Sequence, residues 1–169
     1  LTGVSIPIVL DPVMVAKGGA ALLADDAAAA LVARLLPVAA VVTPNVPELA
    51  VLTGAEAGDE VDMLLAAQEL LAQGPAAVLA KGGHLPGDRV VDWLVSHNAQ
   101  QRFEAPRIQG GNTNGTGCTL ASAIATGLAA GLPLATAVER ARAYLLSALA
   151  AAPGLGRGHG PLGHNFALR

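Results

Sequence analysis

Gly110-Gly111-Asn112-Thr113-Asn114-Gly115-Thr116-Gly117-Cys118-Thr119 is a glycine-rich loop that leads directly into an alanine-rich segment, residues 120–125. Glycine lets the backbone adopt conformations that a side chain forbids, and it lets a ligand approach closely. The pattern predicts a helix over 116–130 that ends at Gly131, with Thr116 or Asn114 as its cap. The first-turn N–H groups lack partners inside such a helix, and the macrodipole makes that end positive. We therefore expect an anion site here, with phosphate as the usual anion.

Cys118 lies in the first turn of this helix. The positive helix end favours the thiolate, so the loop offers an anion cradle with a titratable group beside it. The alternative is an ordinary helix start with a small buried cysteine. The loop is not a Walker A motif, because no Gly-Lys-Ser/Thr follows the glycines. The segment before it, residues 105–109, is also a poor match to the strand of a Rossmann fingerprint.

Short apolar segments rich in β-branched residues alternate with helical patterns along the chain. This alternation predicts an α/β fold, a three-layer αβα sandwich with a mostly parallel sheet. At 169 residues we expect a single domain, 1–169, with a glycine-rich tail over 153–169 that either closes over the site or is disordered. Buried strands are expected at 6–10, 38–43 and 76–80. Helices are expected at 25–36, 46–53, 61–72 and 134–151, the first of them capped by Asp25-Asp26. Residues 90–95 and 101–105 are expected to form a hairpin, with Trp93 and Phe103 on its inner face.

Polar residues follow each of the first three expected strands. Asp11 follows the first, Asn45 and Glu48 follow the second, and Lys81 begins a Lys-Gly-Gly loop after the third. Ligands of open α/β sheets bind at the carboxyl ends of the strands, so these side chains are expected at one edge. The spacing of Asn45 and Glu48 also predicts a capping box, which is compatible with a ligand role. Carboxylates, a cation and a helix start at one edge indicate phosphoryl transfer.

The sequence resembles the hydroxymethylpyrimidine/phosphomethylpyrimidine kinases, which are thiamine-biosynthesis members of the ribokinase superfamily. The resemblance spans essentially the whole chain and implies a ribokinase-like fold with ATP and Mg²⁺ as cofactors. The motifs that carry it are Asp11-Pro12-Val13-Met14-Val15-Ala16-Lys17, Thr43-Pro44-Asn45-Val46-Pro47-Glu48, Lys81-Gly82-Gly83-His84, Gly115-Thr116-Gly117-Cys118-Thr119-Leu120-Ala121-Ser122-Ala123-Ile124 and Gly156-Arg157-Gly158-His159-Gly160-Pro161.

The resemblance also implies roles for individual residues. Magnesium would be held largely through water, since this ion keeps several waters and takes few carboxylates. Cys118 would be the base that accepts the hydroxyl proton of the substrate. The chain has Asn112 and Asn114 where the family usually has histidines, which removes a source of positive charge. The implied sets are Asp11, Asn45 and Glu48 for the metal, Lys81, Thr43, Asn45 and Lys17 for the nucleotide, Val13 for the pyrimidine, and Gly115, Thr116, Gly117 and Cys118 for catalysis.

The implied reaction is transfer of the ATP γ-phosphoryl group to 4-amino-5-hydroxymethyl-2-methylpyrimidine, and then to its monophosphate.

Three alternatives stay open on the sequence. A pyridoxal kinase of the same superfamily can share the Gly-Thr-Gly-Cys loop. The chain can also be a non-catalytic fragment or subunit that folds only against a partner. A cysteine hydrolase would need a histidine within hydrogen-bond reach of Cys118. Lys17 is equally compatible with a solvated loop lysine.

Composition and charge narrow the class of protein. The net charge of −3 provides no basic field for nucleic acid. No apolar run has the length of a membrane span, and a single cysteine with no signal-peptide pattern indicates the cytoplasm. We expect no nucleic-acid or membrane partner, and a homo-oligomer for the full-length form.

The first residue is Leu1, whereas the resembling kinases have several strand–helix units before the position of Asp11. We therefore expect residues 1–169 to be a carboxyl-terminal portion of such a kinase, with the amino-terminal units missing. Alone it would be nearly inactive on the pyrimidine. It would also tend to self-associate through an unpaired sheet edge.

Overall fold

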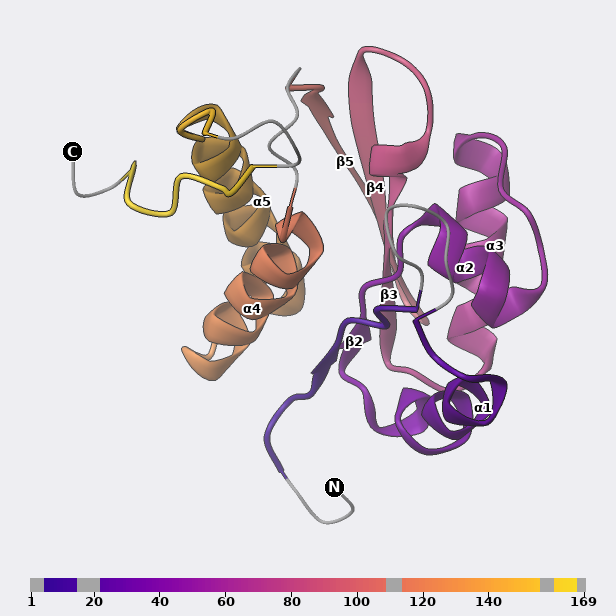
Figure 1. Cartoon of the computed structure of the whole chain (residues 1–169). Coiled ribbons are helices and arrows are strands. Elements are labelled where there is room, and N and C mark those ends of the chain that lie inside the picture. Colours follow the sequence, from indigo (N-terminus) through magenta and orange to yellow (C-terminus); the bar gives the residue numbers. More distant parts are fainter. Residues whose placement is uncertain (1–4, 15–21, 109–113, 156–159, 167–169) are drawn as a thin grey trace. The chain divides into compact units, whose positions relative to one another are not determined.

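The computed structural model describes residues 5–14, 22–108, 114–155 and 160–166. The chain divides into two compact units, Leu1–Pro106 and Arg107–Arg169. The first unit contains a β-sheet with its helices, and the second contains a pair of helices and the carboxyl-terminal segment (Figure 1). Because of this division, the single domain over 1–169 stays a prediction.

The first unit is built on a five-stranded sheet of order β1-β2-β3-β4-β5. β1 pairs parallel with β2, and β2 with β3, whereas the pairs β3–β4 and β4–β5 are antiparallel. Only β4 is therefore reversed, and the predicted α/β fold with a mostly parallel sheet is confirmed. The strands are β1 (Val9–Leu10), β2 (Val41–Val42), β3 (Ala77–Lys81), β4 (Arg89–Ser96) and β5 (Gln100–Pro106).

The helices of this unit lie on one side of the sheet (Figure 1). They share one apolar core with the strands, in which Leu36, Leu49, Met63, Leu70 and Val78 are fully buried. Leucine at helical spacing meets β-branched residues of the strands here, as the sequence pattern predicts. The helices are α1 (Asp25–Arg34), the 3₁₀ turn η1 (Leu36–Val38), α2 (Val46–Thr53) and α3 (Glu60–Ala72).

The first two strands and the first helix differ from the prediction. Pro7 has no N–H for a ladder, and β1 begins only at Val9, where both of its residues are half-buried rather than buried. Residues 36–38 form a 3₁₀ turn with Pro37 as its second residue, so β2 is limited to Val41–Val42. The N-cap of α1 is Ala24 rather than Asp25 or Asp26, whereas the Asp26 carboxylate accepts a hydrogen bond of 2.8 Å from the N–H of Ala27 in the first turn, as capping by this residue predicts.

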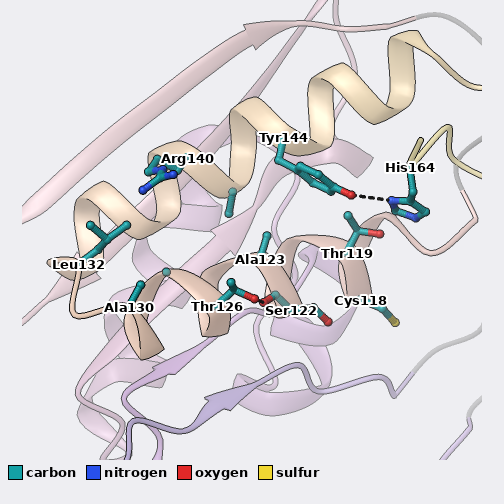
Figure 2. A pocket seen from close by; sticks show the side chains of 12 residues that line it. Cys118, Thr119, Ser122, Ala123, Thr126, Ala130, Leu132, Arg140, Tyr144 and His164 are labelled. Atoms are coloured by element: carbon teal, nitrogen blue, oxygen red, sulfur yellow. Dashed lines mark hydrogen bonds between the residues drawn. The ribbon is translucent and has the colours of Figure 1, made fainter. Parts of the chain in front are cut away.

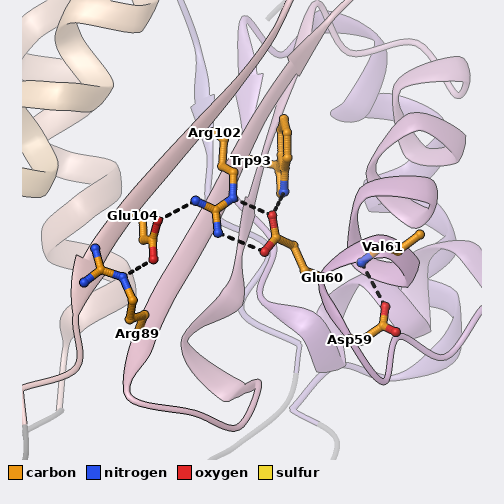
Figure 3. Close-up of polar contacts among 7 residues, drawn as sticks. All are labelled: Asp59, Glu60, Val61, Arg89, Trp93, Arg102 and Glu104. Atoms are coloured by element: carbon orange, nitrogen blue, oxygen red, sulfur yellow. Dashed lines mark hydrogen bonds and ion pairs between the residues drawn. The ribbon is translucent and has the colours of Figure 1, made fainter.

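The antiparallel hairpin of β4 and β5 is confirmed, but its aromatic residues do not share a face. Trp93 lies opposite Arg102, whereas Phe103 lies opposite Asp92. Adjacent residues of a strand point to opposite faces, so only one of the two rings can face the helices. Trp93 packs against the core, and its indole N–H donates to Glu60 at the start of α3. Arg102 holds the same carboxylate with two hydrogen bonds and also pairs with Glu104, which fastens the hairpin to α3 (Figure 3).

The second unit contains α4 (Thr116–Ala129) and α5 (Leu134–Ala150), which pack closely as a helical hairpin. A Cβ atom on Gly127 would lie 2.9 Å from the Cβ atom of Ala137, so only glycine permits this approach. The carboxyl-terminal segment returns to α5, where the N–H of Gly163 donates to the carbonyl of Ala148 at 2.9 Å. Across the described segments, every helix is too short or too polar to span a bilayer.

Candidate functional site at the carboxyl edge of the sheet

Backbone hydrogen bonds bring the ends of the three parallel strands into line. The N–H of Thr43 donates to the carbonyl of Leu10, and the N–H of Lys81 donates to the carbonyl of Pro44, each at 2.9 Å. These bonds extend the ladder one step beyond the strands. The residues that follow β1 and β2 are thereby placed beside the end of β3. The shared edge that the sequence predicts is therefore present in the first unit.

Asp11 and Lys81 form an ion pair at this edge. The Lys81 Nζ atom lies 3.0 Å from Asp11 Oδ1, and both side chains are largely buried, with 13% and 14% of their surface exposed. The same carboxylate oxygen accepts a hydrogen bond of 2.9 Å from the hydroxyl of Thr43, which is fully buried. Three residues from three strand ends thus meet at one carboxylate, although 70 positions separate Asp11 from Lys81.

Asn45 and Glu48 form the predicted capping box at the start of α2. The Asn45 side chain accepts from the N–H of Glu48 at 3.0 Å, and the Glu48 carboxylate accepts from the N–H of Asn45 at 2.8 Å. Glu48 is only 3% exposed. Burial raises the pKa of this carboxyl above its usual value; the Asn45 N–H and the charge of Lys81 oppose the rise, whereas the charge of Asp11 adds to it. The Glu48 carboxyl group is therefore hydrogen-bonded to the start of α2 and has little contact with water.

The burial of Glu48 leads to a prediction about stability and pH. Glu48→Ala leaves the Asn45 N–H without this acceptor and should lower the free energy of unfolding by about 1–2 kcal/mol. Glu48→Gln keeps an acceptor oxygen and should cost less. Because the folded-state pKa of Glu48 is raised, its contribution is present below the unfolded pKa and is lost as pH rises through the folded pKa. Glu48→Gln should therefore gain stability relative to the wild type as the pH rises above the ordinary carboxyl pKa of 4.5, measured by urea denaturation at a series of pH values. A constant difference across these pH values would contradict the effect of burial.

In the second unit, α4 begins as the glycine-rich loop predicts, but with a different cap. Gly115 is the N-cap, with a φ of +80° in the left-handed region, and it has no side chain to cap the helix. The expectation of a cap by Thr116 or Asn114 is therefore wrong, because the loop enters the helix through a conformation that favours glycine. The helix provides no internal acceptor for the N–H groups of Gly117 and Cys118.

Cys118 is exposed in the first turn of α4, so the alternative of a buried structural cysteine is wrong. It lines a pocket of about 610 Å³ between α4 and α5 (Figure 2). Within the described part of the chain, no hydrogen bond joins this thiol to a histidine, and His164 instead pairs through Nδ1 with the Tyr144 hydroxyl at 3.3 Å. The lining residues are Cys118, Thr119, Ser122, Ala123, Thr126, Gly127, Ala130, Leu132, Arg140, Ala141, Tyr144 and His164.

Of the remaining predicted site residues, Val13 is among those that the structure describes, and Lys17 is not. Val13 lies just after β1 and is 47% exposed, which leaves its side chain accessible. Lys17, Asn112 and the motif segment 156–159 lie outside the described residues. Asp11 and Cys118 belong to different units, so a pocket that both of them face stays a prediction. The sequence analysis missed Asp92, a buried carboxylate that accepts from the Gly82 N–H at 2.9 Å.

Known proteins are similar to this chain over nearly its whole length. A family profile described as phosphomethylpyrimidine kinase matches residues 1–163. The hydroxymethylpyrimidine/phosphomethylpyrimidine kinase of Streptomyces coelicolor is 49% identical over 168 residues, which are 99% of this chain and 62% of that protein. The chain thus spans less than two thirds of the length of such relatives.

Solved structures of two related kinases also match most of this chain. The pyridoxal kinase of Bacillus subtilis, in an ADP complex, matches with a TM-score of 0.87 and 33% identity over 95% of this chain and 61% of that one. The phosphomethylpyrimidine kinase of Clostridium difficile matches with a TM-score of 0.71 and 38% identity over 83% of this chain and 56% of that one.

Proposed function

The chain belongs to the phosphomethylpyrimidine kinase family, and from this premise we propose that it is a phosphotransferase of thiamine diphosphate biosynthesis. The proposed reaction moves the γ-phosphoryl group of ATP to the hydroxymethyl group of 4-amino-5-hydroxymethyl-2-methylpyrimidine. A second transfer to the monophosphate gives the diphosphate. The observation that carries the proposal is the cluster of Asp11, Thr43 and Lys81 at the carboxyl edge of a mostly parallel sheet.

Lys81 would bind the nucleotide phosphates, with Thr43, Asn45 and Lys17 as the other members of that set. The ion pair with Asp11 holds the Lys81 ammonium in place before a ligand arrives. Such preorganisation lowers the cost of binding a charged group, because the side chain does not have to be ordered again. The ADP complex of the related pyridoxal kinase supports nucleotide binding by this fold.

The oxygen atoms of Asp11, Asn45 and Glu48 would hold Mg²⁺, which would supply positive charge to neutralise the phosphates. These residues fit the ion, because hard oxygen donors are the ligands that Mg²⁺ prefers. Among the residues whose placement is described, no group of three or more His, Cys, Asp and Glu could hold a metal. The ion would therefore keep several water ligands, as Mg²⁺ does in phosphate-binding sites.

The start of α4 would hold the phosphoryl group during transfer. Gly115, Thr116 and Gly117 give the backbone N–H groups of a helix N-terminus, whose dipole favours negative charge. The exposed Cys118 side chain, in its thiolate form, would accept the hydroxyl proton of the pyrimidine and become the thiol, and Val13 would contact the pyrimidine ring. Little base strength is required, because positioning and charge stabilisation dominate phosphoryl transfer.

Pyridoxal phosphorylation is the second candidate function, since the related pyridoxal kinase matches with the higher TM-score. The higher sequence identity to the Streptomyces pyrimidine kinase favours the pyrimidine. The two candidates differ in the acceptor alone, because both use the same nucleotide and the same edge of the sheet.

An ADP-release assay with either acceptor separates the two candidates. It is run on the chain and on a chimera in which residues 1–169 replace the matched 62% of the Streptomyces enzyme. We expect kcat/KM for the hydroxymethylpyrimidine to exceed that for pyridoxal by at least about tenfold in the chimera. Preference for pyridoxal would assign the second function. A chimera that folds and binds ATP but transfers to neither acceptor would refute both.

A further inference from the structure

We propose that Asp92 is a positioning residue that fixes the turn after β3 and so directs Lys81 toward Asp11. The proposal rests on the proposed function only for the role of Lys81 in nucleotide binding. The effect of Asp92 on the turn and on Lys81 lies within the first unit and can be tested without any substrate.

Asp92 lies directly opposite Lys81 in the antiparallel pairing of β3 and β4. At Lys81 the chain leaves the strand and enters the 3₁₀ turn η2 (Gly82–His84). The first N–H of this turn, that of Gly82, donates to Asp92 Oδ1 at 2.9 Å in a buried bond. Asp92 is 5% exposed, so its carboxylate faces the backbone of the turn rather than solvent. The bond thus fixes the backbone immediately after the nucleotide-binding lysine.

Close packing against the backbone of β4 also restricts the conformation of this turn. A Cβ atom on Gly82 would lie 2.0 Å from the carbonyl oxygen of Val91, a backbone atom that cannot move aside cheaply. Glycine therefore lets the turn lie against β4, within reach of the carboxylate of the next residue, Asp92. Gly83 has no atom within 4 Å of its Cβ position, which makes it a matched control for any substitution in this turn.

The acceptor oxygen, rather than the negative charge, is the feature of Asp92 that the turn requires. Asparagine has the same shape and retains an acceptor oxygen at this position, whereas alanine has none. A buried N–H without an acceptor favours a different backbone path. When the turn shifts, the Lys81 ammonium loses its fixed distance to Asp11 and becomes accessible to solvent.

Lysine acylation reports this change directly, because the sequence contains two lysines, Lys17 and Lys81. The purified chain is treated with an acetylating N-hydroxysuccinimide ester, and the acetylation rates of both lysines are followed by mass spectrometry. The rate of Lys81 is divided by that of Lys17. We expect Asp92→Ala to raise this ratio about tenfold and Asp92→Asn to leave it within about twofold of the wild type. Asp11→Asn removes the partner of Lys81 and serves as the positive control.

The glycine pair tests the same turn without touching Asp92. Gly82→Ala should raise the Lys81 ratio as Asp92→Ala does, whereas Gly83→Ala should not, and these variants decide the question if Asp92→Ala fails to fold. Circular dichroism verifies the fold of each variant. An unchanged ratio in folded Asp92→Ala overturns the proposal. An equal rise in Asp92→Asn also overturns it, because the charge would then be the active feature.

ATP affinity, measured in the same variants by calorimetry, separates this proposal from the proposed function. If Asp92→Ala raises the acylation ratio and weakens ATP binding by about tenfold, with Asp92→Asn near the wild type in both, positioning and nucleotide binding are both supported. If the acylation ratio rises but ATP affinity is unchanged, Asp92 positions Lys81 and the nucleotide role of Lys81 is refuted.

Discussion

Cys118→Ala should lower kcat by about 100-fold while leaving the affinity for ATP unchanged, because a base acts in the transfer step and not in nucleotide binding. The thiol is exposed at the first turn of α4, where a substrate hydroxyl can reach it. The measurement is steady-state phosphoryl transfer in the chimera with the Streptomyces enzyme, together with ATP binding by calorimetry.

Ser122→Ala is the matched control for the cysteine. Ser122 lies one turn further along α4 and lines the same pocket, and its truncation removes a group of similar size (Figure 2). It should leave kcat within about twofold of the wild type, because it is not in the first helical turn. Turnover by Cys118→Ala at the wild-type rate would leave the backbone N–H groups and the metal as the source of catalysis.

The fold could be predicted where local pattern and tertiary packing agree. The helix α2, its capping box and its end at Gly54 follow from Asn45, Glu48 and a glycine with positive φ, all within one short segment. The β4–β5 hairpin follows from two runs of alternating residues around a polar turn. Both elements depend on interactions between residues that are close in sequence, which a pattern can indicate.

Longer-range effects account for the elements that the sequence did not predict correctly. The length of β2 depends on where the 3₁₀ turn around Pro37 ends. The separation of Trp93 from Phe103 depends on the register of the hairpin, since a shift of one residue would exchange their faces. Asp92 lies in a run of apolar residues, and only the pairing of β3 with β4 brings it to the Gly82 N–H.

The site in the first unit could be predicted because parallel strands end at one edge. That topology places Asp11, Thr43 and Lys81 together without any local sequence signal that links them. The start of α4 was predicted from its glycines, but Gly115 as the cap was not, because a glycine in the left-handed conformation leaves no side-chain signal. A common pocket for Asp11 and Cys118 remains a prediction, based on the position of each residue at a strand end or a helix start.

Asp11→Asn should raise the Mg²⁺ concentration required for half-maximal transfer and lower kcat/KM for ATP by about 100-fold. Asparagine can still accept the hydrogen bond of the Thr43 hydroxyl, but it removes the ion pair with Lys81 and the carboxylate proposed for the metal. One substitution therefore affects both charged partners of the phosphates. ADP release is measured in the chimera across a range of Mg²⁺ concentrations.

Two variants show which property of Asp11 matters. Asp88→Asn removes the same charge from an exposed loop of the first unit and should change neither parameter. Thr43→Val removes the hydroxyl that orients Asp11 while leaving both charges, so its effect should be intermediate, at about tenfold. Equal losses for Thr43→Val and Asp11→Asn would assign the effect to the orientation of the carboxylate. An unchanged Mg²⁺ requirement in Asp11→Asn would remove this residue from the metal site and leave it as the partner that holds Lys81 in place.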